Sequence, residues 1–200
     1  MKNIALFVAL CASFVATAQD DLIRSVAGNQ SANAGFQFTT VINLERTDVK
    51  DQGSSGTCWS YAGASFIESE MKRMGKKPID LAEIFTARNC YIEKAKQYVR
   101  MHGNLDYGQG GELHDVINMY AKYGAVPQNI YTGLNYGTTR NDFGELHAIL
   151  QGFLKGMIRN GEKKKKLTPN WLPAFTATID AYLGAVPESF MYEGKKYTPQ

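Results

Sequence analysis

The residues whose types and spacing best suit catalysis lie in the segment VKDQGSSGTCW, at positions 49–59. Cys58 follows a stretch of glycine and serine and precedes a helical pattern, so we expect it in the first turn of a helix. Unpaired backbone N–H groups and the helix dipole stabilise a thiolate at that end of a helix, and the thiolate is the nucleophilic form of cysteine. The segment therefore predicts a cysteine nucleophile at Cys58.

Gln52 lies six residues before Cys58 and carries a neutral side-chain donor. Together with the backbone N–H of Cys58, it can hold the negative oxygen that develops during acyl transfer. Gly53 and Gly56 let the intervening loop turn tightly and approach a substrate closely. The alternative interpretation is a buried core cysteine that happens to follow a loop of small residues.

The eight residues 52–59, QGSSGTCW, resemble the signature Q-G-x-C-G-S-C-W of papain-like cysteine peptidases. Ser55 is the departure, because papain and the cathepsins carry a disulfide cysteine at this position. The serine is similar to the branch without disulfides, which includes bleomycin hydrolase and aminopeptidase C. The resemblance implies that Cys58 is the nucleophile, that Gln52 is the oxyanion donor and that Trp59 contributes to substrate binding.

A second stretch, residues 110–131, also resembles this family. In papain-like enzymes, a Gly-Gly pair before a helix forms one wall of the cleft, and its bare backbone pairs with the substrate like an added strand. The resemblance thus implies that Gly110 and Gly111 bind substrate. An ordinary loop before a helix is the alternative for this piece alone.

The N-terminus reads as a targeting segment. Lys2 precedes an apolar run from 4 to 15, and an A-T-A cleavage site ends at Ala18, which is typical of a secretory signal peptide over 1–18. We expect a periplasmic or secreted protein without membrane association after cleavage; an uncleaved anchor is the alternative. Residues 19–37 are expected to form a leader arm.

Charge and cysteine content limit the partners. Loss of Lys2 lowers the formal net charge from +3 to +2, so no polyanionic partner is expected. The lysine run 163–166 is read as a solvated loop rather than a nucleic-acid contact. Cys58 and Cys90 are not expected to pair, and Cys90 is interpreted as a core thiol. No cofactor and no metal are predicted, and a homo-oligomer is possible for a longer form of the protein.

The patterning predicts a mainly helical chain. A weak alternation indicates a short strand over 38–44, and two short strands are expected around Glu193-Gly194. Tyr61, Ala62, Ser65 and Phe66 are expected to share one face of the first helix. Helices are predicted to start near Thr57, Asp80, Leu113, Asp142 and Leu172, and to end near Gly75, Gly103, Gly124, Gly161 and Leu183; Asp80–Glu83 and Asp142–Glu145 are predicted to form capping boxes.

The resemblance implies an α+β papain-like fold. We expect a helical left domain over 38–135 and part of a helical insertion over 136–200, whose closing FMYEGKKYTP resembles bleomycin hydrolase-like peptidases. The chain is expected to stop before the β-rich right domain, because Thr198-Pro199 is typical of a helix start and only Gln200 follows it.

A thiolate peptidase needs a base, and the family places its His and Asn far downstream of the Cys. His102 and His114 have no motif around them. His147 resembles the family's H-A-hydrophobic strand, but it lies in an amphipathic helical pattern. We therefore expect the base outside these 200 residues, and we expect the isolated chain to be inactive.

Two functions follow from these patterns. The first is a cysteine-type peptidase, expected to act as an aminopeptidase on short peptides. The second is a non-catalytic papain-like module that binds peptides without cleaving them.

Overall fold

The computed structural model describes residues 39–164 and 166–200. The predicted signal peptide and leader arm therefore lie outside the described residues. The chain divides into a segment that ends at Asn43 and a compact unit from Leu44 to Gln200. The helices, the hairpin and the predicted site all belong to the second unit.

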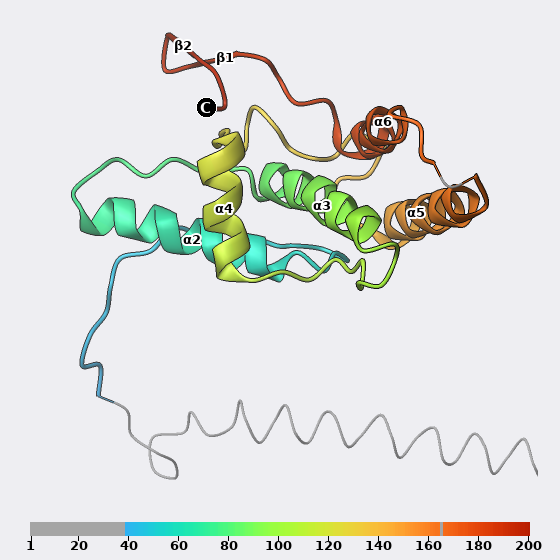
Figure 1. Ribbon diagram of the computed structural model, residues 1–200. Coiled ribbons are helices and arrows are strands. Elements are labelled where there is room, and N and C mark those ends of the chain that lie inside the picture. Colours follow the sequence, from blue (N-terminus) through green and yellow to red (C-terminus); the bar gives the residue numbers. More distant parts are fainter. Residues whose placement is uncertain (1–38, 165) are drawn as a thin grey trace, which may run out of the picture. The chain divides into compact units, whose positions relative to one another are not determined.

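This unit is mostly helical, with one small hairpin near its end (Figure 1). The two short strands predicted around Glu193-Gly194 are present, and they are antiparallel with Phe190 opposite Tyr197. The described elements are α2 (Cys58–Arg73), α3 (Glu83–Arg100), α4 (Leu113–Tyr123), α5 (Gly144–Lys164), α6 (Trp171–Leu183), β1 (Phe190–Tyr192) and β2 (Lys195–Tyr197). The five predicted helices are confirmed.

Helix α3 is the centre of the packing, because it contacts α2, α4, α5 and α6. Its first three turns are buried on every side, and Cys90 lies among them as predicted. Helix α5 buries Leu146, Leu150 and Leu154 at a spacing of four residues, so one apolar stripe faces the core. Helix α6 does the same with Phe175, Ile179 and Leu183.

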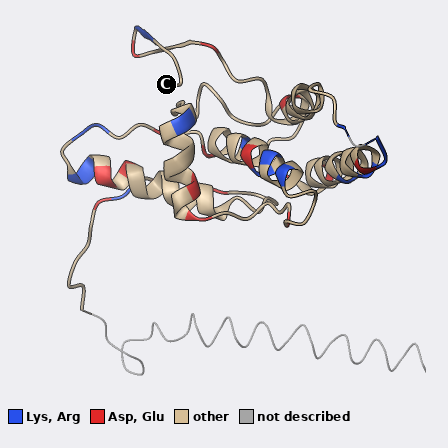
Figure 2. Cartoon of the chain, viewed as in Figure 1, with Lys and Arg blue, Asp and Glu red and all other residues tan. Residues whose placement is uncertain are grey.

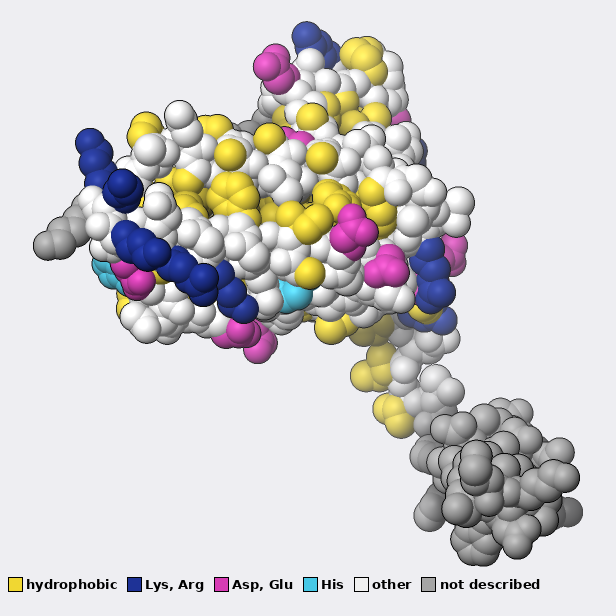
Figure 3. Space-filling view, turned by 90° about the vertical axis from the view of Figure 1, so that its right-hand side faces the viewer, with side chains coloured by type: hydrophobic (Ala, Val, Ile, Leu, Met, Phe, Trp, Pro, Cys, Tyr) yellow, Lys and Arg dark blue, Asp and Glu magenta, His cyan; other side chains and the backbone are white. Residues whose placement is uncertain are grey.

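Basic residues occupy the last turns of α2 to α5, where they complement the negative end of each helix dipole (Figure 2). Lys163 and Lys164 are among them, so the lysine run begins inside α5 rather than in a loop. Both side chains are exposed. Figure 3 shows the α5 and α6 end of the molecule, where basic side chains form a row beside a band of apolar ones.

The buried face of α2 is not the face that Tyr61, Ala62, Ser65 and Phe66 share. Phe66 is 54% exposed, whereas the helix buries the small or polar residues Ser60, Gly63, Ala64 and Glu68 together with Trp59. Close helix packing selects small side chains on this face, and Glu68 is buried because it forms an ion pair. Hydrophobicity alone therefore pointed to the wrong side of the helix.

The two predicted capping boxes are also not formed as expected. Helix α3 begins at Glu83, after Ala82, and the carboxylates of Asp80 and Glu83 both bind Lys50 instead of the helix terminus. At α5, Asp142 Oδ1 accepts a hydrogen bond from Gly144 N at 3.0 Å, but Glu145 accepts one from a tyrosine hydroxyl. In each case a partner distant in sequence competes for the acid.

Two further boundaries differ from the prediction. Residues 39–44 form no strand. Helix α5 passes through Gly161 and ends at Lys164, because Gly161 does not adopt the positive φ that Gly75, Gly103 and Gly124 adopt beyond their helices. The space left by the absent Gly161 side chain is used by Leu167, which lies 2.6 Å from an added Cβ.

The packing of α2 on α4 yields a prediction. An added Cβ at Gly63 would lie 2.6 Å from Val116 Cγ2, so Gly63→Ala should overpack the interface and lower the free energy of unfolding by about 1–3 kcal/mol. Gly152→Ala is the control, since Gly152 is exposed within α5 with open space around it, and it should raise stability by about 0.5–1 kcal/mol. Urea unfolding measures both, and equal stability of the two variants would contradict the packing.

Candidate active site

The loop before α2 is held closed by its own side chains. Gln52 Nε2 donates a hydrogen bond to the Ser55 carbonyl at 2.6 Å, and Ser55 Oγ donates one to the Gln52 carbonyl at 2.7 Å. Ser55 Oγ also lies 2.5 Å from the Thr57 hydroxyl. Gln52 therefore uses one of its two amide hydrogens within the loop.

The same loop is anchored to the segment that leads into α5. Ser54 N donates to the Asn141 carbonyl at 2.8 Å, and Phe143 N donates to the Ser54 carbonyl at 3.0 Å. Gly53 has a φ of +64°, and an added Cβ would lie 2.4 Å from the Asn141 carbonyl oxygen. The glycine is thus required both by the backbone conformation and by the close contact.

Cys58 is the first residue of α2, as predicted, and its side chain is exposed. Cys90 is buried, and both thiols are free. Burial raises the pKa of the Cys90 thiol to about 12; Lys94 lowers this pKa by a smaller amount, and Asp115 and Glu93 raise it slightly. Of these two cysteines, therefore, Cys58 alone presents its thiol to solvent.

The Gly110–Gly111 segment lies against the residue that follows the nucleophile. Trp59 Nε1 donates to the Gln109 carbonyl at 3.0 Å, and an added Cβ on Gly111 would lie 2.7 Å from the indole ring. The structure thus brings Trp59, the residue after Cys58, against Gln109 and Gly111. Trp59 is only 6% exposed, so its contact with Gly111 is interior packing.

The three histidines lie elsewhere. The His147 ring, on α5, stacks on the Tyr107 ring with 6.1 Å between the ring centroids, and partial burial lowers the pKa of His147. His102 follows the end of α3, and His114 is exposed at 3.7 Å from Asp115. None of them forms a hydrogen bond with Cys58 in the described part of the chain. That placement agrees with the expectation that the helical context of His147 opposes a role as base.

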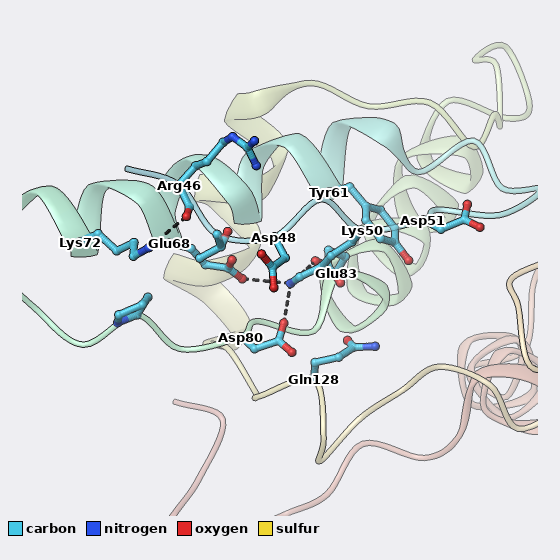
Figure 4. Close-up of a pocket in the computed structure, with 12 residues that line it drawn as sticks. Arg46, Asp48, Lys50, Asp51, Tyr61, Glu68, Lys72, Asp80, Glu83 and Gln128 are labelled. Atoms are coloured by element: carbon cyan, nitrogen blue, oxygen red, sulfur yellow. Dashed lines mark hydrogen bonds and ion pairs between the residues drawn. The ribbon is translucent and has the colours of Figure 1, made fainter. Parts of the chain in front are cut away.

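Lys50, two residues before Gln52, is the centre of an ion cluster that the sequence did not predict. Lys50 Nζ is 2.6 Å from Glu83 Oε1, 2.5 Å from Asp80 Oδ1 and 3.1 Å from Glu68 Oε1 (Figure 4). Glu68 and Glu83 are 0% and 1% exposed, so the lysine offsets two buried acids. Arg46 and Lys72 lie at the rim of the same cavity, which has a volume of about 570 Å³.

The charges in this cluster depend on one another. Burial alone would lower the pKa of Lys50, but its hydrogen bonds to Asp80, Glu83 and Glu68 raise that pKa well above its ordinary value. Burial raises the pKa of Glu83, against the opposing effect of Lys50.

Within residues 39–164 and 166–200, no group of His, Cys, Asp and Glu side chains is arranged to hold a metal ion. No helix of that part is long and apolar enough to cross a membrane.

Comparison with known proteins relates this site to peptidases. No family model matches the chain. Cysteine proteinase 1, mitochondrial, from Saccharomyces cerevisiae is 25% identical over 119 residues, which are 51% of this chain and 25% of the relative. Aminopeptidase C from Streptococcus thermophilus is 26% identical over 133 residues, or 58% of this chain and 30% of the relative. Mouse cathepsin K is 33% identical over 69 residues, or 30% of this chain and 21% of the relative.

The fold agrees with these relatives. The crystal structure of PepW from Lactobacillus rhamnosis superposes with a TM-score of 0.56 at 19% identity, covering 81% of this chain and 44% of that one. The chain therefore has a papain-like fold, which confirms the predicted fold class. It is similar in sequence to cysteine peptidases, an aminopeptidase C among them, and it spans about a quarter of the length of the first curated relatives. The domain boundary near residue 135 stays a prediction.

The ion cluster predicts a stability effect. Lys50→Met should lower the free energy of unfolding by about 3–5 kcal/mol, because it leaves two buried carboxylates without a cation. Lys76→Met is the control, since Lys76 is exposed and should change stability by less than about 0.5 kcal/mol. A group with a raised folded-state pKa stabilises the fold below its unfolded pKa, about 10.4 for lysine, so the difference should persist from about pH 7 to about pH 9. Denaturant unfolding of both variants at these pH values measures the two free energies of unfolding. Equal values for Lys50→Met and Lys76→Met would contradict a stabilising role of the ion cluster.

The thiol environments predict selective alkylation. Iodoacetamide should modify Cys58 in the folded protein and spare Cys90, because Cys90 is buried with its pKa raised to about 12. Peptide mapping by mass spectrometry assigns the adducts, and Cys90→Ser should leave the rate at Cys58 unchanged. Equal labelling of both thiols before unfolding would contradict the burial of Cys90.

Proposed function

We propose that this chain carries the nucleophile and one cleft wall of a cysteine-type aminopeptidase that hydrolyses short peptides. The observation that supports this most directly is the exposed Cys58 thiol at the first residue of α2. Gly56 and Trp59, which flank it in sequence, are both hydrogen-bonded to Gln109 in the Gly-Gly segment. The thiol is therefore presented beside backbone that can accept an extended peptide.

In the proposed reaction, the Cys58 thiolate attacks the carbonyl carbon of the bond to be cleaved. The carbonyl oxygen takes the negative charge, and the backbone N–H of Cys58 and the second amide hydrogen of Gln52 stabilise it. The amine leaves with a proton from a general acid, and water then hydrolyses the thioester to release the acyl part and regenerate the thiol. We assign the acid–base role to a histidine outside these 200 residues, so the isolated chain is expected to be inactive.

The substrate end is part of the proposal. The named relatives include an aminopeptidase C, and we propose the same preference for a free amino end in this protein. The proposed location is periplasmic or secreted, from the signal peptide predicted over 1–18. No nucleic-acid partner and no cofactor are part of the proposed reaction.

A non-catalytic peptide-binding module is the second candidate. Such a module would keep the loop of Cys58 and the Gly110–Gly111 segment but would have no base. The two functions differ in turnover, since a binding module would retain peptides without releasing a cleaved product.

Replacement of the nucleophile tests the proposal. In the protein expressed from the complete open reading frame, Cys58→Ala should reduce hydrolysis of aminoacyl coumarin amides to background, because no thioester can form. N-acetylated versions of the same reporters should be poor substrates if a free amino end is required. Hydrolysis retained by Cys58→Ala would exclude the proposed nucleophile, and binding without turnover by the unsubstituted protein would favour the second candidate.

Gln52→Ala should lower kcat by about 100-fold with a smaller change in KM, because an oxyanion donor acts mainly in the transition state. A change confined to KM would contradict the role. The purified 200-residue chain should show no turnover, whereas turnover that disappears in His147→Ala would assign the base to His147.

A further inference from the structure

The side chain of Gln109 connects two loops that are far apart in sequence. Gly56 N donates a hydrogen bond to Gln109 Oε1 at 2.7 Å, across 53 positions of the chain. An added Cβ on Gly56 would lie 2.8 Å from Gln109 Cβ, so the loop backbone lies directly against this side chain. The backbone carbonyl of the same residue accepts the Trp59 indole N–H. Gln109 therefore contacts the chain on both sides of Cys58.

The other anchors of the Gly-Gly segment do not reach the loop before α2. Gln151 Nε2, on α5, donates to the Tyr107 carbonyl at 3.1 Å. Lys94, on α3, donates to the carbonyls of Gly108 and Gly110. These contacts hold the segment to other helices, whereas the Gln109 side chain holds it to Gly56.

We propose that Gln109 is a positioning residue that keeps the nucleophile loop in register with the Gly110–Gly111 wall. A bound peptide would have to place its carbonyl oxygen at the Cys58 N–H and its backbone along Gly110–Gly111 at the same time, so the spacing of these two elements determines whether both contacts form. Gln109 sets that spacing through one side-chain and one main-chain hydrogen bond. Its catalytic meaning rests on the proposed function, but the contact itself does not.

The length and the acceptor of the side chain are both used. Oε1 accepts from a backbone N–H, so a carboxylate of equal length can replace the amide. Asparagine keeps the amide but is one methylene shorter and cannot reach Gly56 without a backbone shift. Methionine keeps the length and removes the strong acceptor.

The test is amide hydrogen exchange in the 200-residue chain, followed by NMR or mass spectrometry at the residues of the loop. Gln109→Met should speed exchange of the Gly56 amide by about tenfold, the effect expected for loss of one hydrogen bond, and Gln109→Asn should do the same. Gln109→Glu should restore the protection. Gln151→Met is the matched control, because it removes a glutamine contact to the same segment and should leave Gly56 exchange unchanged.

Two controls separate a local effect from a global loss of structure. A global loss would lower the temperature of thermal unfolding, and it would speed amide exchange throughout α3 as well as at Gly56. Slow Gly56 exchange in folded Gln109→Met or Gln109→Asn would overturn the proposal, and so would failure of Gln109→Glu to restore it. None of these measurements needs turnover, so failure of the peptidase proposal and failure of the Gln109 contact would be seen separately.

Discussion

The contact between the Trp59 indole and the Gly-Gly segment is the constraint on which the rest of the site depends. Trp59 follows Cys58 directly, so a restraint on the indole also restrains the thiol at the first turn of α2. Gly111 must lack a side chain for the ring to approach, and the Gln109 carbonyl fixes the ring by accepting its N–H. One apolar surface and one hydrogen bond thus bring nucleophile and wall together.

Polar contacts to distant segments hold the loop that precedes Cys58. Lys50 joins its start to the buried acids Glu68 and Glu83, and Asn141 accepts a backbone hydrogen bond from its middle. Ser60 Oγ donates to the Glu83 carbonyl at 2.7 Å, which connects the first turn of α2 to the first residue of α3. A loop of glycine and serine buries little apolar surface, so such contacts have to replace hydrophobic packing.

Short sequence patterns predicted the features that depend on neighbouring residues. The position of Cys58 at a helix start, the glycines beyond α2, α3 and α4, and the burial of Cys90 follow from short-range signals. The buried face of α2 was missed because small and charged side chains fill it. The role of Lys50 was missed because its partners lie up to 33 residues away, and no short pattern marks such a cluster.

We propose that the Cys58 thiolate at the start of α2 attacks the carbonyl carbon of a peptide. The most direct test is to incubate the active protein with an aminoacyl vinyl sulfone and to locate the adduct by mass spectrometry. This reagent binds through its aminoacyl group in the substrate site and then alkylates the catalytic thiolate. We expect one adduct, on the peptide that contains Cys58, with simultaneous loss of hydrolysis. Loss of hydrolysis with the adduct on another residue, or full activity with Cys58 modified, would contradict it.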